Sequence, residues 1–73
     1  MLYCGIHGTV LSTGERKKKD GTVTPYIDVH IEESEYVARV HNYHGGTVAK
    51  FDEVTLAVKV YSNENGFYIT HAD

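Results

Sequence analysis

The chain has 73 residues, a formal net charge of −3 and a single cysteine, Cys4. A chain of this length forms one domain, residues 1–73, with a small core. One cysteine allows neither an intrachain disulfide nor a zinc site built on cysteine pairs. No run of about 18 apolar residues is present, so we expect a cytoplasmic protein without a membrane helix. Ten Asp and Glu against seven Lys and Arg argue against indiscriminate nucleic-acid binding.

The first 24 residues predict a bent strand followed by a basic finger. Residues 2–12 alternate between two sets of side chains, as a strand does, and Gly5 and Gly8 interrupt the pattern. Glycines inside a strand mark a bend, a bulge or a close approach of backbones. Residues 13–24 are polar, with six consecutive charged residues from Glu15 to Asp20. This segment is therefore either a mobile loop or a short β-ribbon.

Residues 25–43 predict a β-hairpin that turns at residues 33–35 and has two unlike faces. Alternation places one set of residues on the buried face: Ile27, Val29, Ile31, Tyr36, Ala38 and Val40. The outer face then carries aromatic rings and cationic or protonatable groups: Tyr26, His30, Arg39, His41 and Tyr43. Asp28 and Glu32 share this face and would repel phosphate unless His30 and Arg39 pair with them.

The remainder of the chain predicts two further strands. Residues 47–53 are too short for a stable helix, so we expect a turn or loop from which Phe51 closes one barrel end. Residues 54–61 alternate, with Lys59 and Tyr61 facing outward, and a turn at residues 65–66 leads to a last strand over residues 67–71. In that strand Phe67 and Ile69 are expected to face inward, and Tyr68 and Thr70 outward.

Five short strands with a bent first strand and little helix predict an all-β fold, a five-stranded antiparallel OB-type barrel. An SH3-like small barrel is the alternative. Several short features, in the same order, resemble the small single-stranded-DNA-binding proteins of filamentous phages. They span about two-thirds of the chain: Gly21, Pro25-Tyr26, Glu35-Tyr36-Val37, the strand at residues 54–61, Asn65-Gly66 and Phe67-Tyr68-Ile69. The resemblance implies an OB-fold homodimer that serves a phage or plasmid, for example in DNA replication.

The function predicted from these residues is binding of single-stranded nucleic acid, DNA or RNA, with little sequence preference. Such sites combine a cationic groove for the backbone with aromatic faces on which bases stack. We expect Tyr26, Tyr43 and Tyr61 to stack bases, Arg39 and Lys59 to hold the backbone, and His30 and His41 to add charge when protonated. Arg39 could instead stack on a base. The four consecutive cations, Arg16, Lys17, Lys18 and Lys19, would form an electrostatic clamp.

Three other functions compete with nucleic-acid binding. A protein-interaction module, an adaptor or inhibitor using the same tyrosine-rich face, is the main alternative, because tyrosines are common at protein interfaces. The five histidines lack the spacing of a metal site, so no metal or other cofactor is predicted. No catalytic motif is present, so we expect no enzymatic activity.

Overall fold

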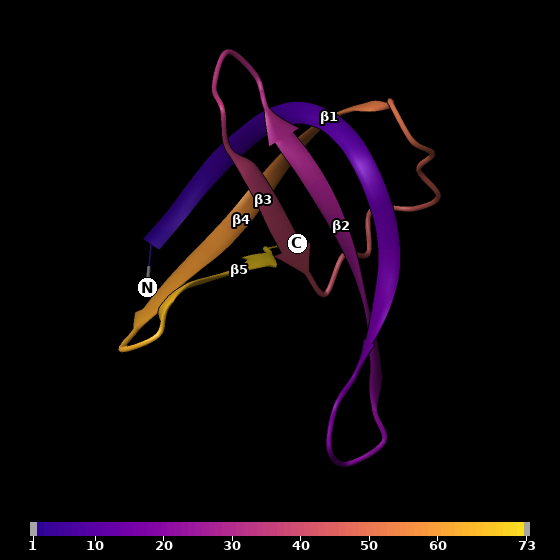
Figure 1. Ribbon diagram of the computed structural model, residues 1–73, viewed down its shortest axis with the longest axis vertical. Helices are drawn as coiled ribbons and strands as arrows, with labels where there is room; N and C mark the ends of the chain where they lie inside the picture. Colours follow the sequence, from indigo (N-terminus) through magenta and orange to yellow (C-terminus); the bar gives the residue numbers. More distant parts are fainter. Residues whose placement is uncertain (1, 73) are drawn as a thin grey trace.

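The structure, a computed structural model, describes residues 2–72 as five strands that form a closed barrel (Figure 1). The strands are β1 (Leu2–Lys17), β2 (Val23–Ile31), β3 (Val37–His41), β4 (Glu53–Asn63) and β5 (Gly66–His71). They follow the order β1-β2-β3-β5-β4, and β4 pairs with β1 to close the barrel. The predicted all-β, five-stranded OB-type barrel is confirmed. One pair, β3 with β5, is parallel, so the barrel is mixed rather than wholly antiparallel. Within the described residues no helix is long and apolar enough to cross a membrane.

Strand β1 pairs with two different strands along its length, which agrees with the predicted bend in the first strand. Residues 2–9 pair with β4, and residues 8–17 pair with β2. The register of the second pairing shifts between Val10 and Ser12, which marks a β-bulge. A bulge bends its strand, and β1 accordingly runs as an arch over the rest of the molecule (Figure 1).

Gly8 lies where β1 crosses from one pairing to the other. A Cβ atom there would overlap the carbonyl oxygen of His30 and lie 2.8 Å from Cγ1 of Val29. The predicted close backbone approach is therefore confirmed at Gly8. At Gly5 the atom nearest to an added methyl group would be the Leu56 carbonyl oxygen at 3.8 Å, which is an ordinary contact.

The core consists of residues that alternate along the strands. Five side chains are fully buried: Val10, Ile27, Val29, Val40 and Val58. Leu56 and Tyr43 complete the cluster, and Ile6, Val48, Val54, Val60 and Ile69 pack against it. The inward face predicted for residues 54–61 and for Ile27, Val29 and Val40 of the hairpin is thus confirmed. Tyr36, predicted on the same face, is 76% exposed, because it lies in the turn before β3 begins at Val37.

The basic segment is a β-ribbon rather than a loop, because β1 continues to Lys17 and β2 begins at Val23. We call residues 14–26 the basic ribbon. At its tip the Lys18 amide donates to the carbonyl of Thr22 (2.8 Å), and the Gly21 amide donates to the carbonyl of Lys18 (3.0 Å). The Asp20 carboxylate accepts from the Thr22 amide (2.9 Å). These bonds define the turn that carries Lys18 and Lys19.

The exposure of Phe51, Phe67 and Thr70 differs from what the sequence pattern predicted. Phe51 is 67% exposed and does not close the barrel, because its amide and the Asp52 carbonyl pair with Val10 across the bulge while its ring points outward. Phe67 is 79% exposed, because β3 pairs with β5 only from Ile69 onward and leaves the start of β5 uncovered. Thr70 faces outward with its register partner Lys59, as expected, but is only 8% exposed.

The two glycines of β1 provide a matched test of barrel closure. Gly8→Ala should lower the free energy of unfolding by about 2 kcal/mol or more, because the backbone of β2 must move to admit the methyl group. Gly5→Ala should change it by no more than about 0.5 kcal/mol. Urea unfolding of the two variants measures both effects, and equal stabilities would contradict this account of strand crossing.

Candidate nucleic-acid interface

The outer face of β2 and β3 brings together polar and aromatic side chains in adjacent rows. Tyr26 is the register partner of His41, and Asp28 is the register partner of Arg39. Because partners in an antiparallel pair point to the same side of the sheet, all four side chains share the outer face. The sequence prediction for Tyr26, Arg39 and His41 is confirmed in this respect.

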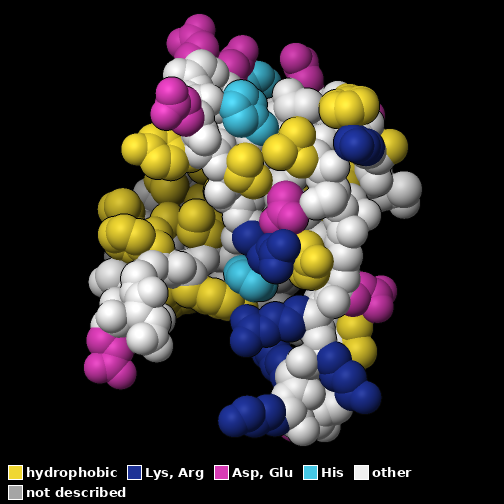
Figure 2. Space-filling view, in the orientation of Figure 1, with side chains coloured by type: hydrophobic (Ala, Val, Ile, Leu, Met, Phe, Trp, Pro, Cys, Tyr) yellow, Lys and Arg dark blue, Asp and Glu magenta, His cyan; other side chains and the backbone are white. Residues whose placement is uncertain are grey.

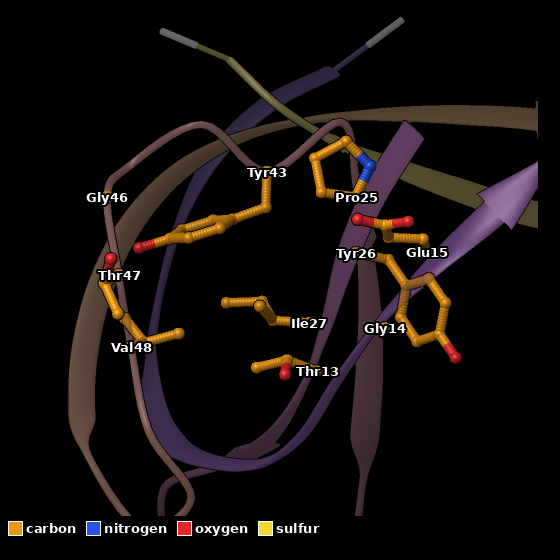
Figure 3. A pocket seen from close by; sticks show the side chains of 10 residues that line it. All are labelled: Thr13, Gly14, Glu15, Pro25, Tyr26, Ile27, Tyr43, Gly46, Thr47 and Val48. Carbon is orange, nitrogen blue, oxygen red and sulfur yellow. The ribbon is translucent and has the colours of Figure 1, made fainter. Parts of the chain in front are cut away.

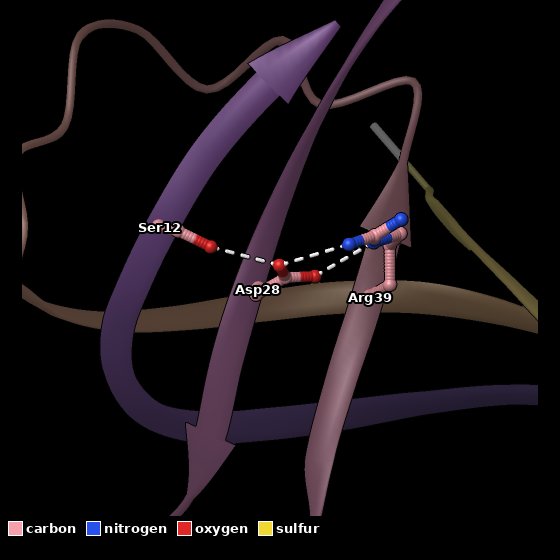
Figure 4. Close-up of polar contacts among 3 residues, drawn as sticks. All are labelled: Ser12, Asp28 and Arg39. Carbon is pink, nitrogen blue, oxygen red and sulfur yellow. Dashed lines mark hydrogen bonds and ion pairs between the residues drawn. The ribbon is translucent and has the colours of Figure 1, made fainter. Parts of the chain in front are cut away.

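Arg39 and Asp28 form an ion pair at the centre of this face (Figure 4). Nε of Arg39 donates to Oδ1 of Asp28 (2.8 Å), and Nη2 donates to Oδ2 (3.2 Å). The Ser12 hydroxyl donates to Oδ2 from β1 (2.8 Å). These hydrogen bonds, the one from Arg39 above all, lower the pKa of Asp28 below its ordinary value, so it is a carboxylate at neutral pH. The predicted pairing of Asp28 with Arg39 is confirmed.

Tyr26 lies between Arg39 and the β1 backbone. The Arg39 guanidinium carbon is 4.1 Å from the centre of the Tyr26 ring. On the β1 side, a Cβ atom at Gly14 would lie 2.5 Å from Oη and 2.6 Å from Cζ of Tyr26. The absence of a side chain at Gly14 is therefore what lets the ring lie down across the sheet.

His41 extends the aromatic row from β3 to β5. Its ring stacks on Tyr68, with centroids 4.4 Å apart and planes inclined by 17°, and its centroid is 6.3 Å from that of Tyr26. Burial, followed by the charges of Arg16 and Arg39, lowers the pKa of His41 below 6.5. The ring is therefore neutral at pH 7 and acts there as an aromatic surface.

Strand β4 adds a further part of the same outer surface. Tyr61 is the register partner of Tyr68, and Lys59 is the register partner of both Thr70 and Tyr3. The Lys59 ammonium lies 5.7 Å from the centre of the Tyr3 ring. The sequence prediction for Lys59 and Tyr61 as outward residues agrees with these pairings.

Positive charge concentrates on the basic ribbon, at the border of this face. Arg16 and Lys17 lie in the last part of β1, and Lys18 and Lys19 lie in the turn. Figure 2 shows the dark blue side chains gathered along the ribbon, with a hollow between the ribbon and the β4–β5 hairpin. Within the described residues, none of these four cations forms an ion pair, so their charges remain available.

Two of the predicted binding residues have other contacts. Tyr43 is only 8% exposed and belongs to the core, where its ring stacks on His71 with centroids 5.2 Å apart. Its predicted place on the outer face is wrong, because β3 ends at His41 and the alternation does not continue past it. His30 donates from Nε2 to the carbonyl of Ser34 (2.8 Å) and so braces the β2–β3 turn. Glu32, on the same turn, pairs with His7 (3.1 Å) rather than with His30.

The structure adds Tyr68 and Tyr3 to the set expected from the sequence. Alternation in the last strand already indicated that Tyr68 faces outward. Its contact with His41 depends on the parallel pairing of β3 with β5. Tyr3 joins the face through the pairing of β1 with β4.

A cavity of about 320 Å³ lies at the base of the ribbon, where Gly14 and Tyr26 are among the residues that line it (Figure 3). Tyr43, Ile27 and Val48 form its apolar part, and Thr13, Glu15 and Thr47 contribute polar groups. A second cavity, of about 470 Å³, adjoins Tyr43 near His44 and His71. Among residues 2–72, no group of three or more His, Cys, Asp or Glu side chains is arranged to hold a metal ion.

Comparisons with known proteins do not assign a role to the outer face, so its role is inferred from the chemistry of its side chains. No family model matches the chain, and no curated protein or solved structure matches it. The resemblance to the phage single-stranded-DNA-binding proteins stays a prediction.

The contribution of Asp28 to stability should depend on pH with a defined sign. Since its folded-state pKa lies below 3.8, Asp28 stabilises the fold above that pH and loses this effect as the pH falls further. Asp28→Asn should lower the melting temperature by roughly 3–6 °C at pH 7. The gap should shrink below about pH 4.

Thermal melts of the wild type and of Asp28→Asn between pH 7 and pH 3 measure this gap. Glu35→Gln, which changes an exposed carboxylate in the β2–β3 turn, is the control. A gap that stays constant down to pH 3 would show that the carboxylate of Asp28 is not stabilised by its partners.

Proposed function

We propose that this protein binds single-stranded nucleic acid with little sequence preference, across the outer face of β2, β3 and β5. The observation that supports this most is the continuous row of flat groups from Tyr26 and Arg39 through His41 to Tyr68. In OB-type barrels the face of strands 2 and 3 and its bordering loops bind oligonucleotides. Stacking on such rings tolerates any base, since every base has a π-face.

The basic ribbon complements the row of rings. It supplies four cations without ion-pair partners in the described chain, beside a surface whose own acidic group, Asp28, is neutralised by Arg39. With Glu15 and Asp20 counted against its four cations, the ribbon keeps a formal charge of +2, although the chain carries −3 overall. A single strand can place its phosphates along the ribbon while its bases lie on the rings. A duplex hides its base faces and gains only the phosphate contacts.

Binding of labelled oligo-dT and of an equal-length duplex, followed by fluorescence anisotropy at several salt concentrations, tests the proposal. We expect the single strand to bind more tightly, with an affinity that falls steeply with salt. Replacing Lys17, Lys18 and Lys19 by Gln should reduce the logarithmic salt slope by about 2, since each phosphate contact contributes about 0.7. Lys50→Gln, in the loop before β4, serves as the control and should leave the slope unchanged. Absence of single-strand binding by the wild type at low salt would refute the proposal.

Contact with another protein is a second candidate function. It is favoured by exposed apolar side chains near the β4–β5 turn and the start of β1. Leu2 is 64% exposed and Phe67 is 79% exposed, although their register partners Val60 and Ser62 place them on the inward side of the sheet. Residues 2–6 of β1 pair with β4 on one edge and have no strand partner among residues 2–72 on the other. Unpaired edges tend to pair with further strands.

We propose that the partner at this end is a second copy of the chain, which presents the same free edge and the same apolar face. No Asp, Glu, Lys or Arg occurs between Leu2 and Gly14, and the one histidine there, His7, is paired with Glu32, so two copies of β1 can approach without like-charge repulsion. Sedimentation equilibrium should show a dimer for the wild type. Phe67→Ser should weaken this dimer at least tenfold, while Val23→Ser, which changes an exposed residue on the ribbon, should not. At about 100 µM even a weak dimer is substantially populated. A wild type that is still monomeric at this concentration would refute the homodimer.

A further inference from the structure

The arrangement of Tyr26, Arg39 and Asp28 indicates which side chain contacts a nucleobase. This inference rests on the proposed function and specifies the binding site further. Tyr26 is the ring that the sequence indicates for stacking. Its hydroxyl end, however, lies against Gly14 of β1, and the guanidinium of Arg39 covers the ring at 4.1 Å. Tyr26 is half-buried, whereas the Arg39 side chain is 53% exposed. The outermost flat group at this position is therefore the guanidinium.

Arg39 is held in a fixed orientation. Two hydrogen bonds from Nε and Nη2 to the two oxygens of Asp28 restrain the guanidinium, and the Tyr26 ring supports it from beneath. Asp28 is itself held by the Ser12 hydroxyl (2.8 Å), from the far side of β2 (Figure 4). A guanidinium restrained in this way presents a flat surface without an ordering cost at the moment of binding.

The charge of Arg39 is already matched by that of Asp28. A phosphate approaching the guanidinium would meet the negative carboxylate at the same place, which weakens any phosphate contact there. An unpaired base carries no charge and meets no such opposition. Arginine guanidinium planes stack on bases in this manner in single-stranded recognition.

We propose that Arg39 is the stacking residue for an unpaired nucleobase, that Tyr26 supports it, and that Asp28 is a positioning residue that keeps the guanidinium flat. Phosphate contacts then fall to the cations of the basic ribbon. Of the two roles that the sequence allows for Arg39, the assignment selects base stacking over a contact with the backbone. It also gives Asp28, which looked like an obstacle to binding, a part in it.

The salt dependence of oligo-dT binding separates stacking from phosphate contact at Arg39. Arg39→Lys keeps the charge and loses the plane, so affinity should fall about tenfold, within the range for one stacked base, with the salt slope unchanged. Asp28→Asn frees the guanidinium from its partner. This variant should steepen the slope by about 0.7 and bind more weakly than the wild type at high salt, where only stacking remains.

Two results would overturn the inference while leaving the proposed function in place. One is an Arg39→Lys variant that binds within twofold of the wild type, together with an Arg39→Gln variant whose slope falls by about 0.7, the signature of a phosphate contact. The other is an Asp28→Asn variant that binds at least as tightly as the wild type at high salt, which would mean that Asp28 only repels the ligand. A wild type that does not bind single strands would refute both proposals. Melting temperatures establish that each variant is folded.

Discussion

The sharing of β1 between two pairings is the constraint on which the rest of the structure depends. This strand pairs with β4 along its first half and with β2 along its second half. It therefore has to bend sharply between the two pairings while its backbone groups keep hydrogen-bond partners. Gly8 permits the crossing and the bulge between Val10 and Ser12 supplies the bend. The backbone groups of Val10 at the bulge are bonded by Phe51 and Asp52 instead of by a strand. The loop before β4 thus compensates for the interruption in the ladder.

Closure of the barrel has consequences for the outer face. It sets β1 beside β2 so that Gly14 lies under Tyr26 and Ser12 reaches Asp28. It also joins β3 to β5, which brings Tyr68 against His41. Each of these contacts on the proposed binding face therefore joins residues from two different strands. A surface built in this way is ordered by the barrel before any ligand arrives, which reduces the entropy that binding must overcome.

The division of charge on the surface follows from the same arrangement. Two acidic groups of the hairpin have ionic partners, Asp28 in Arg39 and Glu32 in His7, and the other two, Glu33 and Glu35, lie exposed in the turn away from the centre of the face. The four cations of the basic ribbon have no ion-pair partner in the described chain. A chain with an acidic total can in this way present a positive border to one face. The net charge alone pointed away from nucleic acid, and the pairing of charges removes much of that objection.

The sequence by itself determined the strands and their inward faces, because alternation of apolar residues is a local property with a period of two. Ile27, Val29, Val40 and Val58 could be placed in the core from it, and Tyr26, Arg39 and His41 on the outside. Tyr43 could not be placed correctly, since it lies beyond the end of β3. The exposure of Phe67 could not be predicted either, because β3 pairs with β5 only from Ile69 onward. Only the tertiary structure decided that Arg39 lies over Tyr26, that Asp28 holds it and that Tyr68 joins the row. These contacts join residues far apart in the chain, and strand alternation says which way a side chain points but not which strand becomes its neighbour.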